Sequence, residues 1–415
     1  MTASTAAPDE AAGHPAAPDR HDTCPAPRLF RRGADFSPDF AAGAALGKSV
    51  SPFAAEPLWV VTDWAEARAV LSDAEHFSRG QVEPGGLDPA RLRRLRAGML
   101  LAQDPPEHTR LRRMLTGEFT VRRIRALEPR ITEIVSEHLD RLEAMGPPAD
   151  LVEHFALAIP SLVICELLGV PYEDRDAFQR RAAITVDFTL PEDERRAAGA
   201  ESRAYLGELV ARHRRDPGDD LLSRLVVRHA SSGTDDDLTD DELSGIGHLL
   251  LVAGHETTSN MLALGTLALL RHPEQLALVR DDPAAVAGAV EELLRYLSVV
   301  HTALPRVATA DVQVGGTAVT AGELVAVSLP AANRDASLVD DGDSLDVSRD
   351  PGLHVAFGHG IHHCLGAPLA RVEMQIAFPA LLRRFPRLAV ADDKGAVAFR
   401  TRTLVYGLER LQVTW

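Results

Sequence analysis

The sequence contains little cysteine, few aromatic residues and no long uninterrupted hydrophobic run. Only three cysteines, Cys24, Cys165 and Cys364, occur among 415 residues, and no two of them are close in sequence. Scattered cysteines in odd number make a poor disulfide framework, so we expect a reducing compartment, the cytoplasm. Residues 1–26 contain no apolar segment typical of a signal peptide, and their alanine, proline and aspartate content predicts a disordered N-terminal arm.

The chain also lacks a segment suited to a membrane and an excess of positive charge. The longest apolar run, residues 243–270, contains His248, His255, Glu256 and Asn260, which would be costly in lipid. We therefore expect a long buried helix there and no membrane partner. The net charge of −16 argues against broad binding to nucleic acid, because phosphate surfaces would repel the average field of the protein.

Helical periodicity dominates what is present. It runs through residues 124–145, 157–170 and 284–297, where apolar positions recur at helical spacing. Residues 306–329 instead alternate and turn at Gly315 and Gly316, which predicts a small hairpin region. No internal repeat or domain boundary is visible after the arm. The sequence therefore predicts a mainly α fold with a small β region, in a single domain over residues 27–415.

One ten-residue stretch, FGHGIHHCLG at residues 357–366, combines three histidines with a cysteine. A zinc site needs several such ligands converging, commonly as spaced pairs on different elements. Here His362, His363 and Cys364 are contiguous, so adjacent side chains point to opposite faces, and no second pair lies nearby in sequence. Zinc is therefore a weak interpretation, and a buried structural cysteine is a better description of Cys24 or Cys165.

The glycines around the cysteine indicate a different ligand role. Gly358, Gly360 and Gly366 bracket Cys364, as expected where the backbone turns tightly and lets a flat group approach. A helix is predicted directly after the cysteine, and backbone N–H groups at a helix N-terminus favour thiolate over thiol. A lone thiolate suits the single axial position of a haem iron whose other positions are already filled.

With these residues the stretch resembles the haem-ligand loop of the cytochrome P450 haem-thiolate monooxygenases. The resemblance covers about residues 55–415 and is closest to soluble bacterial members that tailor secondary metabolites. It implies a single domain with the triangular-prism cytochrome P450 fold, and haem b with Cys364 as the metal ligand. Phe357, His362 and Gly366 match further positions of the loop at which the cofactor is contacted.

The resemblance also implies a role for AGHETT, residues 253–258. The segment matches the helix on the distal side of the haem, where Ala253 contacts the cofactor and leaves room for dioxygen. Glu256 and Thr257 would be the catalytic residues that relay protons, which requires a local distortion of the helix. A buried and hydrogen-bonded Glu-Thr pair in a core helix is the alternative.

Several basic residues match the positions that bind the haem propionates. His108 and Arg112 are four residues apart and would project from one helix face, and guanidinium pairs well with carboxylate. Arg306 and His362 match two further contacts. For each residue taken singly, an exposed side chain is the alternative.

A second set of residues matches a structural network behind the haem. Glu292 and Arg295 are three residues apart in EELLR, and Arg349 matches an arginine that joins such a pair from a later loop. We expect these three residues to hold the fold together and to take no part in catalysis. Alone, a Glu-Arg pair at this spacing is equally typical of a solvated ion pair.

The implied reaction is the insertion of one oxygen atom from O2 into a hydrophobic small molecule. We expect hydroxylation or epoxidation of a macrolide, terpenoid or other polyketide, since the positions expected near the substrate are apolar or small. A haem-thiolate enzyme that catalyses oxidative coupling, dehydration or peroxide-driven oxidation is an alternative, and so is a non-enzymatic haem-binding protein. The candidate substrate-contacting residues are Leu249, Val252, Val300 and Leu404.

Electrons would come from NAD(P)H through separate partner proteins, a ferredoxin reductase and a ferredoxin. A local basic cluster on this acidic chain, Arg110, Arg113, Arg122 and Arg123, is the candidate docking site for an acidic ferredoxin. A solvated basic helix face explains the cluster equally well.

Overall fold

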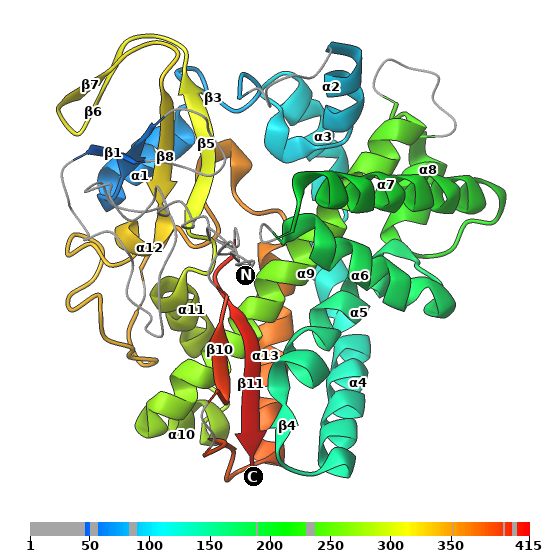
Figure 1. Ribbon diagram of the computed structural model, residues 1–415, viewed down its shortest axis with the longest axis vertical. Helices are drawn as coiled ribbons and strands as arrows, with labels where there is room; N and C mark the ends of the chain where they lie inside the picture. The colour runs from blue at the N-terminus through cyan, green and yellow to red at the C-terminus, as the bar shows by residue number, and fades with distance from the viewer. Residues whose placement is uncertain are drawn as a thin grey trace, which may run out of the picture.

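The computed structural model describes residues 46–49, 57–82, 89–187, 190–229, 237–350, 352–392, 395–400 and 405–415. The predicted arm, residues 1–26, and the candidate substrate contact Leu404 lie outside these ranges. Most of the described chain is helical, and the strands form small sheets, as predicted (Figure 1). In this part of the chain no helix is both long enough and apolar enough to cross a lipid bilayer.

The helices are numbered in chain order. They are α1 (Trp64–Ser72), α2 (Pro89–Arg96), α3 (Glu107–Thr116), α4 (Val121–Met145), α5 (Ala158–Leu168), α6 (Arg175–Val186), α7 (Glu192–Arg215), α8 (Leu221–His229), α9 (Asp240–Arg271), α10 (Pro273–Asp281), α11 (Val286–Leu297), α12 (Leu329–Ala332) and α13 (Ala367–Arg384). Short helical turns are η1 (Leu100–Ala102), η2 (Val152–Ala156), η3 (Tyr172–Asp174) and η4 (Gly360–His362).

The strands are likewise numbered in chain order. They are β1 (Gly47–Ser49), β2 (Leu58–Val61), β3 (Phe77–Ser78), β4 (Ala149–Asp150), β5 (Thr302–Ala308), β6 (Val312–Val314), β7 (Thr317–Val319), β8 (Leu324–Ser328), β9 (Ala389–Val390), β10 (Val397–Phe399) and β11 (Leu408–Thr414). A mixed sheet has the order β1-β2-β8-β5-β3, and a second sheet pairs β11 with β10, β9 and β4.

The predicted hairpin is formed by β6 and β7, which pair antiparallel. Both turn residues, Gly315 and Gly316, have positive φ angles of 54° and 77°. Two consecutive left-handed residues are what a two-residue hairpin turn requires, and glycine adopts that conformation without steric cost. Two neighbouring glycines were therefore enough to predict this turn from the sequence.

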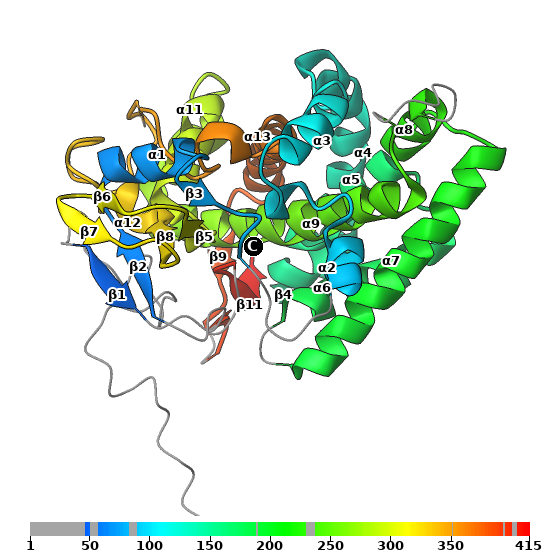
Figure 2. The same cartoon turned by 90° about the horizontal axis from the view of Figure 1, so that it is seen from above.

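The long apolar run forms α9, which passes through the middle of the molecule (Figure 2). The helix begins with a capping box, in which Thr239 accepts from the backbone N–H of Glu242 and Glu242 accepts from that of Thr239. Most residues of α9 after the first turn are buried, and the helix packs against α5, α7 and α13. An almost wholly buried helix has no polar face, which explains why the run is apolar nearly all round.

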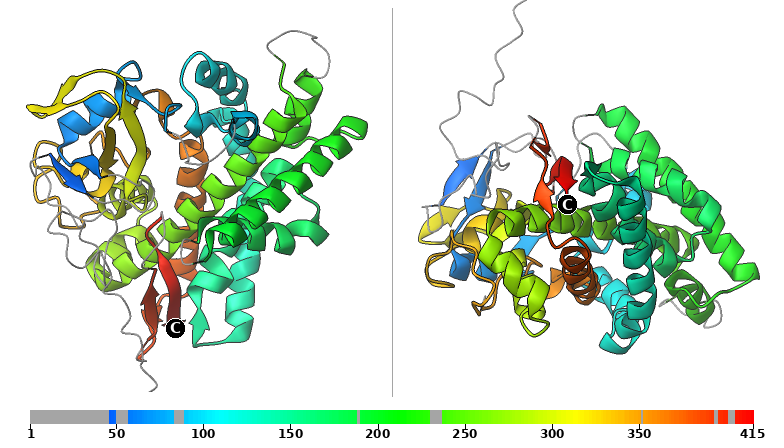
Figure 3. Two further views of the ribbon diagram at one scale, coloured as in Figure 1. Left: turned by 45° about the horizontal axis from the view of Figure 1, so that its top comes forward. Right: turned by 90° about the horizontal axis from the view of Figure 1, so that it is seen from below.

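Two elements that are distant in sequence flank the middle of α9. Helix α13, which directly follows the Cys364 loop, packs against it, and so does the C-terminal strand β11 (Figure 3). The fold therefore brings three parts of the chain together: the Cys364 loop, the centre of α9 and the C-terminal strands.

Candidate haem site

Cys364 lies in the turn between η4 and α13. Its backbone N–H donates to the carbonyl oxygen of Phe357 at 2.9 Å, which closes the loop. Gly358 and Gly360 have φ angles of +72° and +70°, and a Cβ on Gly360 would overlap the carbonyl oxygen of Leu71 in α1. Gly358 and Gly360 thus form the predicted tight turn, and Gly360 is also required by packing against α1, whereas Gly366 has an ordinary φ of −81°.

The two described cysteines have very different surroundings. Cys165 is buried on α5, and burial raises the pKa of its thiol to about 12, so it is inert. Cys364 is exposed, yet the protein around it is dense enough for burial to raise the pKa of its thiol. Hydrogen bonds from the N–H groups of Gly366 and Ala367 and the charge of Arg112 act in the opposite direction. For the protein groups alone the effect of burial is the larger, so the preference for thiolate stays a prediction for the metal-bound site.

In the described ranges no three His, Cys, Asp or Glu side chains converge as metal ligands. The geometry therefore offers no support for a zinc site. A single cysteine ligand is what remains, and it suits a metal whose other positions a prosthetic group fills.

Buried basic groups gather next to the Cys364 loop. The rings of His108 and His362 meet edge to face with centroids 4.4 Å apart. Both ring nitrogens of His108 and Nδ1 of His362 are buried without a hydrogen-bond partner. Burial together with the charges of His108, Arg306 and Arg79 lowers the pKa of His362 to about 3. Such a concentration of unsatisfied donors and positive charge is costly unless an anion occupies it.

Arg79 belongs to this basic group although the sequence did not single it out as a cofactor contact. Burial and the charge of Arg306 lower the pKa of Arg79 to about 10, and burial lowers that of Arg306 to about 10. The nearby carboxylate of Asp104 is already used, since it accepts from Ser78 Oγ at 2.5 Å and from the Arg79 N–H at 2.8 Å. The group therefore fits the two carboxylates of a haem.

Arg112 and His108 lie on the same helix, α3, but contact different residues of the cysteine loop. The Nη1 of Arg112 donates to the carbonyl oxygen of His363 at 2.6 Å. Burial lowers the pKa of Arg112, and the charge of Cys364 opposes this shift. The guanidinium thus ties α3 to the backbone of the cysteine loop. Its assignment to the propionates stays a prediction.

The predicted distal residues occupy different faces of α9. Ala253 is exposed in the middle of the helix, although Leu251, His255 and Glu256 close by are buried. Thr257, one turn further on, donates from Oγ1 to the Ala253 carbonyl oxygen at 2.6 Å. The helix is α throughout, so the expected local distortion is not present: the hydroxyl bonds to the regular backbone without opening it.

Glu256 is buried and points to the C-terminal strands. Its Oε2 accepts from Arg400 Nη1 at 2.7 Å, and its backbone carbonyl accepts from Asn260 Nδ2, also at 2.7 Å. Oε1 is buried without a partner. Arg400 was not predicted, because nothing local in the sequence links it to α9.

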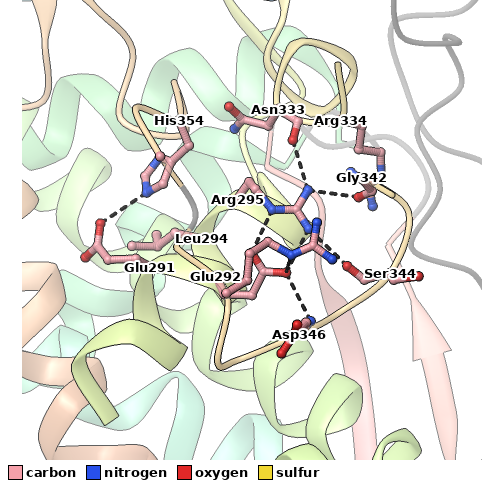
Figure 4. Close-up of polar contacts among 12 residues, drawn as sticks. Glu291, Glu292, Leu294, Arg295, Asn333, Arg334, Gly342, Ser344, Asp346 and His354 are labelled. Atoms are coloured by element: carbon pink, nitrogen blue, oxygen red, sulfur yellow. Dashed lines mark hydrogen bonds and ion pairs between the residues drawn. The ribbon is translucent and has the colours of Figure 1, made fainter. Parts of the chain in front are cut away.

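Glu292 and Arg295 form an ion pair (Figure 4), and Arg349 lies close to the same carboxylate. Arg295 binds both carboxylate oxygens of Glu292 at 2.7 and 2.8 Å, and both side chains are completely buried. Arg349 Nε lies 3.6 Å from Glu292. Arg295 also donates to the carbonyl oxygens of Asn333, Gly342 and Ser344, which holds the connection between α12 and the cysteine loop.

The remaining candidates are only partly accessible. Leu249 is buried one turn before Ala253, and Val252 is half-buried. Val300 forms an isolated β-bridge with Val405.

In the basic cluster, Arg110 pairs with Glu107 and Glu242, and Arg123 lies 3.3 Å from the buried Glu118. Arg122 is exposed. Much of that cluster is therefore used within the protein.

Comparison with known proteins agrees with this geometry. Residues 53–397 match the family model for cytochrome P450. The chain is 46% identical over 365 residues to cytochrome P450 FAS1 of Rhodococcoides fascians, covering 86% of this chain and 90% of that protein. It is 45% identical over 371 residues to pentalenic acid synthase of Streptomyces avermitilis, covering 88% and 90%. The solved structure of P450 StaH from glycopeptide antibiotic A47934 biosynthesis covers 94% of this chain and 100% of its own, with a TM-score of 0.84 and 45% identity. The chain belongs to the cytochrome P450 family of haem-thiolate monooxygenases.

Proposed function

We propose that the protein inserts one oxygen atom from O2 into a hydrophobic small molecule of secondary metabolism. The carrying observation is the buried basic group of His108, His362, Arg79 and Arg306, which has unsatisfied donors on the side of the cysteine loop. This arrangement fits a dianionic prosthetic group next to Cys364. The exposed Ala253, in an otherwise buried stretch of α9, fits the other side of the same flat group.

Each residue then has a defined task. Cys364 would hold the haem iron, with Phe357 and Gly366 beside it, and the basic group would bind the propionates. Haem, when bound, supplies the oxygen chemistry. Thr257 holds a proton on its hydroxyl on the Ala253 side of α9. Glu256 supplies the acidic group for proton transfer. Leu249, Val252 and Val300 provide an apolar substrate surface that excludes water, with Leu404 as a further candidate.

The partners are part of the proposal. Electrons come from NAD(P)H through a ferredoxin reductase and a ferredoxin, since residues 53–397 match the cytochrome P450 family model, whose chemistry requires a supply of electrons. The substrate class is supported by relatives named pentalenic acid synthase and nocardicin C N-oxygenase. We place the reaction in the cytoplasm, in line with the small number of cysteines and with the two described ones, Cys165 and Cys364, which are free thiols.

The first test is the visible spectrum of the purified, haem-supplied protein, reduced and exposed to carbon monoxide, beside Cys364→Ala. A strongly red-shifted Soret band that is lost in the variant supports the thiolate assignment. An unshifted band in the intact protein contradicts it. Candidate polyketides and terpenoids are then screened for spin-state shifts.

Oxidative coupling is the alternative reaction for a haem-thiolate enzyme at this site. Product mass separates the two reactions. Monooxygenation adds one oxygen atom to the substrate, whereas coupling removes two hydrogen atoms and adds no oxygen.

A further inference from the structure

Glu291, Arg371 and His354 form a half-buried polar cluster beside the cysteine loop, in which the side chains of Arg371 and Glu291 are 31% and 26% exposed. Glu291 precedes the Glu292 network on α11, and Arg371 lies on α13. Arg371 donates to both carboxylate oxygens of Glu291, at 2.5 Å from Nε and 2.8 Å from Nη2. His354 Nε2 lies 3.1 Å from Glu291 Oε2, the contact drawn in Figure 4. The Ala356 N–H donates to His354 Nδ1, so the neutral ring carries its proton on Nε2 and donates it to Glu291.

This cluster contacts the loop through the ring of Phe357. The Arg371 guanidinium lies over the ring, 4.7 Å from its centroid, and the Phe357 carbonyl accepts the N–H of Cys364 at 2.9 Å. A continuous set of contacts therefore runs from the carboxylate of Glu291 to the cysteine. A bidentate carboxylate fixes the plane of the guanidinium, which in turn orients the ring.

The charge of Arg371 lies nearer to the cysteine loop than the charge of Glu291 does. The guanidinium contacts the ring, whereas the carboxylate binds the guanidinium, so the positive charge faces the loop. Glu291 is ionised: burial raises its pKa, but hydrogen bonds from Arg371 and His354 prevail and lower it to about 2.

We propose that Glu291 and Arg371 are positioning residues that set the reduction potential of the iron bound by Cys364. The inference rests on the proposed function, which makes Cys364 the axial ligand. Reduction of the ferric site adds one electron, so the positive charge of Arg371 favours the reduced form and the negative charge of Glu291 opposes it. Phe357 transmits the orientation of the pair to the loop.

The test is a spectroelectrochemical titration of the holoenzyme, with dithionite as reductant and mediator dyes. We expect Arg371→Met to lower the potential and Glu291→Gln to raise it. The double variant removes both charges and returns the potential close to that of the wild type. Arg371→Lys keeps the charge, so its potential lies nearer the wild type than that of Arg371→Met. The carbon monoxide spectrum of each variant shows whether the thiolate is retained.

Arg384→Met is the matched control. Arg384 lies on the same helix, α13, but its guanidinium binds Asp140 and Glu143 at the surface. We expect no shift, because Arg384 lies more than three helical turns from Arg371 and its charge is screened over that distance.

The proposal would be overturned if the reduction potentials of the variants do not change. It would also be overturned if the potentials of both single variants shift in the same direction, as general loosening of the loop would cause. A shift in Arg384→Met as large as that in Arg371→Met would also overturn it. Failure of the proposed function is a separate result, since it is an absent Cys364-dependent red-shifted band in the wild-type protein.

Discussion

Arg400 Nη1 lies 2.7 Å from Glu256 Oε2 and joins the C-terminal hairpin to the centre of α9. The same hairpin residue donates its backbone N–H to the carbonyl oxygen of Gly407 at 2.9 Å. A Cβ on Gly407 would overlap the side-chain amide of Asn260, which itself binds the Glu256 carbonyl. The hairpin and the helix therefore meet without space between them at the acidic residue assigned to proton transfer.

Arg400→Ala leaves the buried carboxylate of Glu256 without its cation. Because an unpaired buried charge is costly, we expect a loss of about 3 kcal/mol in the free energy of unfolding, measured by urea titration. Adding Glu256→Gln to this variant restores part of the loss. The control is Arg410→Ala, whose guanidinium binds the carbonyl oxygen of Gly395 at the surface, and we expect about 0.5 kcal/mol or less there. Equal losses in the two arginine variants would show that the ion pair contributes nothing.

Thr257→Ala removes the hydroxyl from the accessible face of α9. We expect NAD(P)H consumption to continue while product formation falls about 10-fold or more, because proton delivery is a general acid contribution of at least that size. Thr257→Ser retains the coupling of the two rates. Thr266→Ala is the control, since Thr266 makes the same bond to a carbonyl four residues earlier but is buried away from Ala253. If the ratio of product formed to NAD(P)H consumed is the same in Thr257→Ala as in the wild type, the result would favour oxidative coupling or a non-enzymatic haem-binding protein.

Gly360→Ala tests whether the loop geometry depends on close backbone packing. The residue has a φ of +70°, and its Cβ would meet the backbone of α1, which cannot move independently. We expect loss of the red-shifted carbon monoxide band together with a lower melting temperature. Gly316→Ala has a similar φ of +77° but no atom within 4 Å of the added Cβ, so it costs only about 1–2 kcal/mol of backbone strain. A Gly360→Ala protein with the wild-type spectrum would contradict the packing argument.

Glu373 predicts a pH dependence of stability. It is buried on α13, and burial raises its pKa from 4.5 to about 8. The folded protein keeps this proton up to about pH 8, whereas the unfolded chain releases it near pH 4.5, so stability falls as the pH rises between these values. The decline is at most about 1.4 kcal/mol per pH unit.

Glu373→Gln mimics the protonated acid and removes this decline. Urea titrations of the variant and the wild type at pH 5 to 9 measure the difference, which we expect to grow up to about pH 8 and then to stay constant. A difference that does not vary with pH would mean that Glu373 is ionised in the folded protein.

Much of the site was readable locally. The cysteine loop is defined by residues within ten positions of one another, and two of its glycines, Gly358 and Gly360, have the backbone angles that only glycine adopts easily. The hairpin at Gly315 and Gly316 and the long buried helix were equally local signals, since periodicity and turn chemistry depend on neighbouring residues. The mainly α fold with a small β region followed from these segments and is confirmed.

The tertiary structure alone decided which distant side chains meet. Arg400 pairs with Glu256 across 144 positions, and Arg371 pairs with Glu291 across 80. Arg79 joins the basic group, and Arg112 turns to the carbonyl of His363 while its helical neighbour His108 does not. The sequence by itself determined the ligand loop and the helices that carry it, because short-range sterics and hydrophobic periodicity act along the chain. It left the charge partners of Glu256 and Glu291 open, because any arginine can satisfy any carboxylate until packing brings two of them within hydrogen-bonding distance.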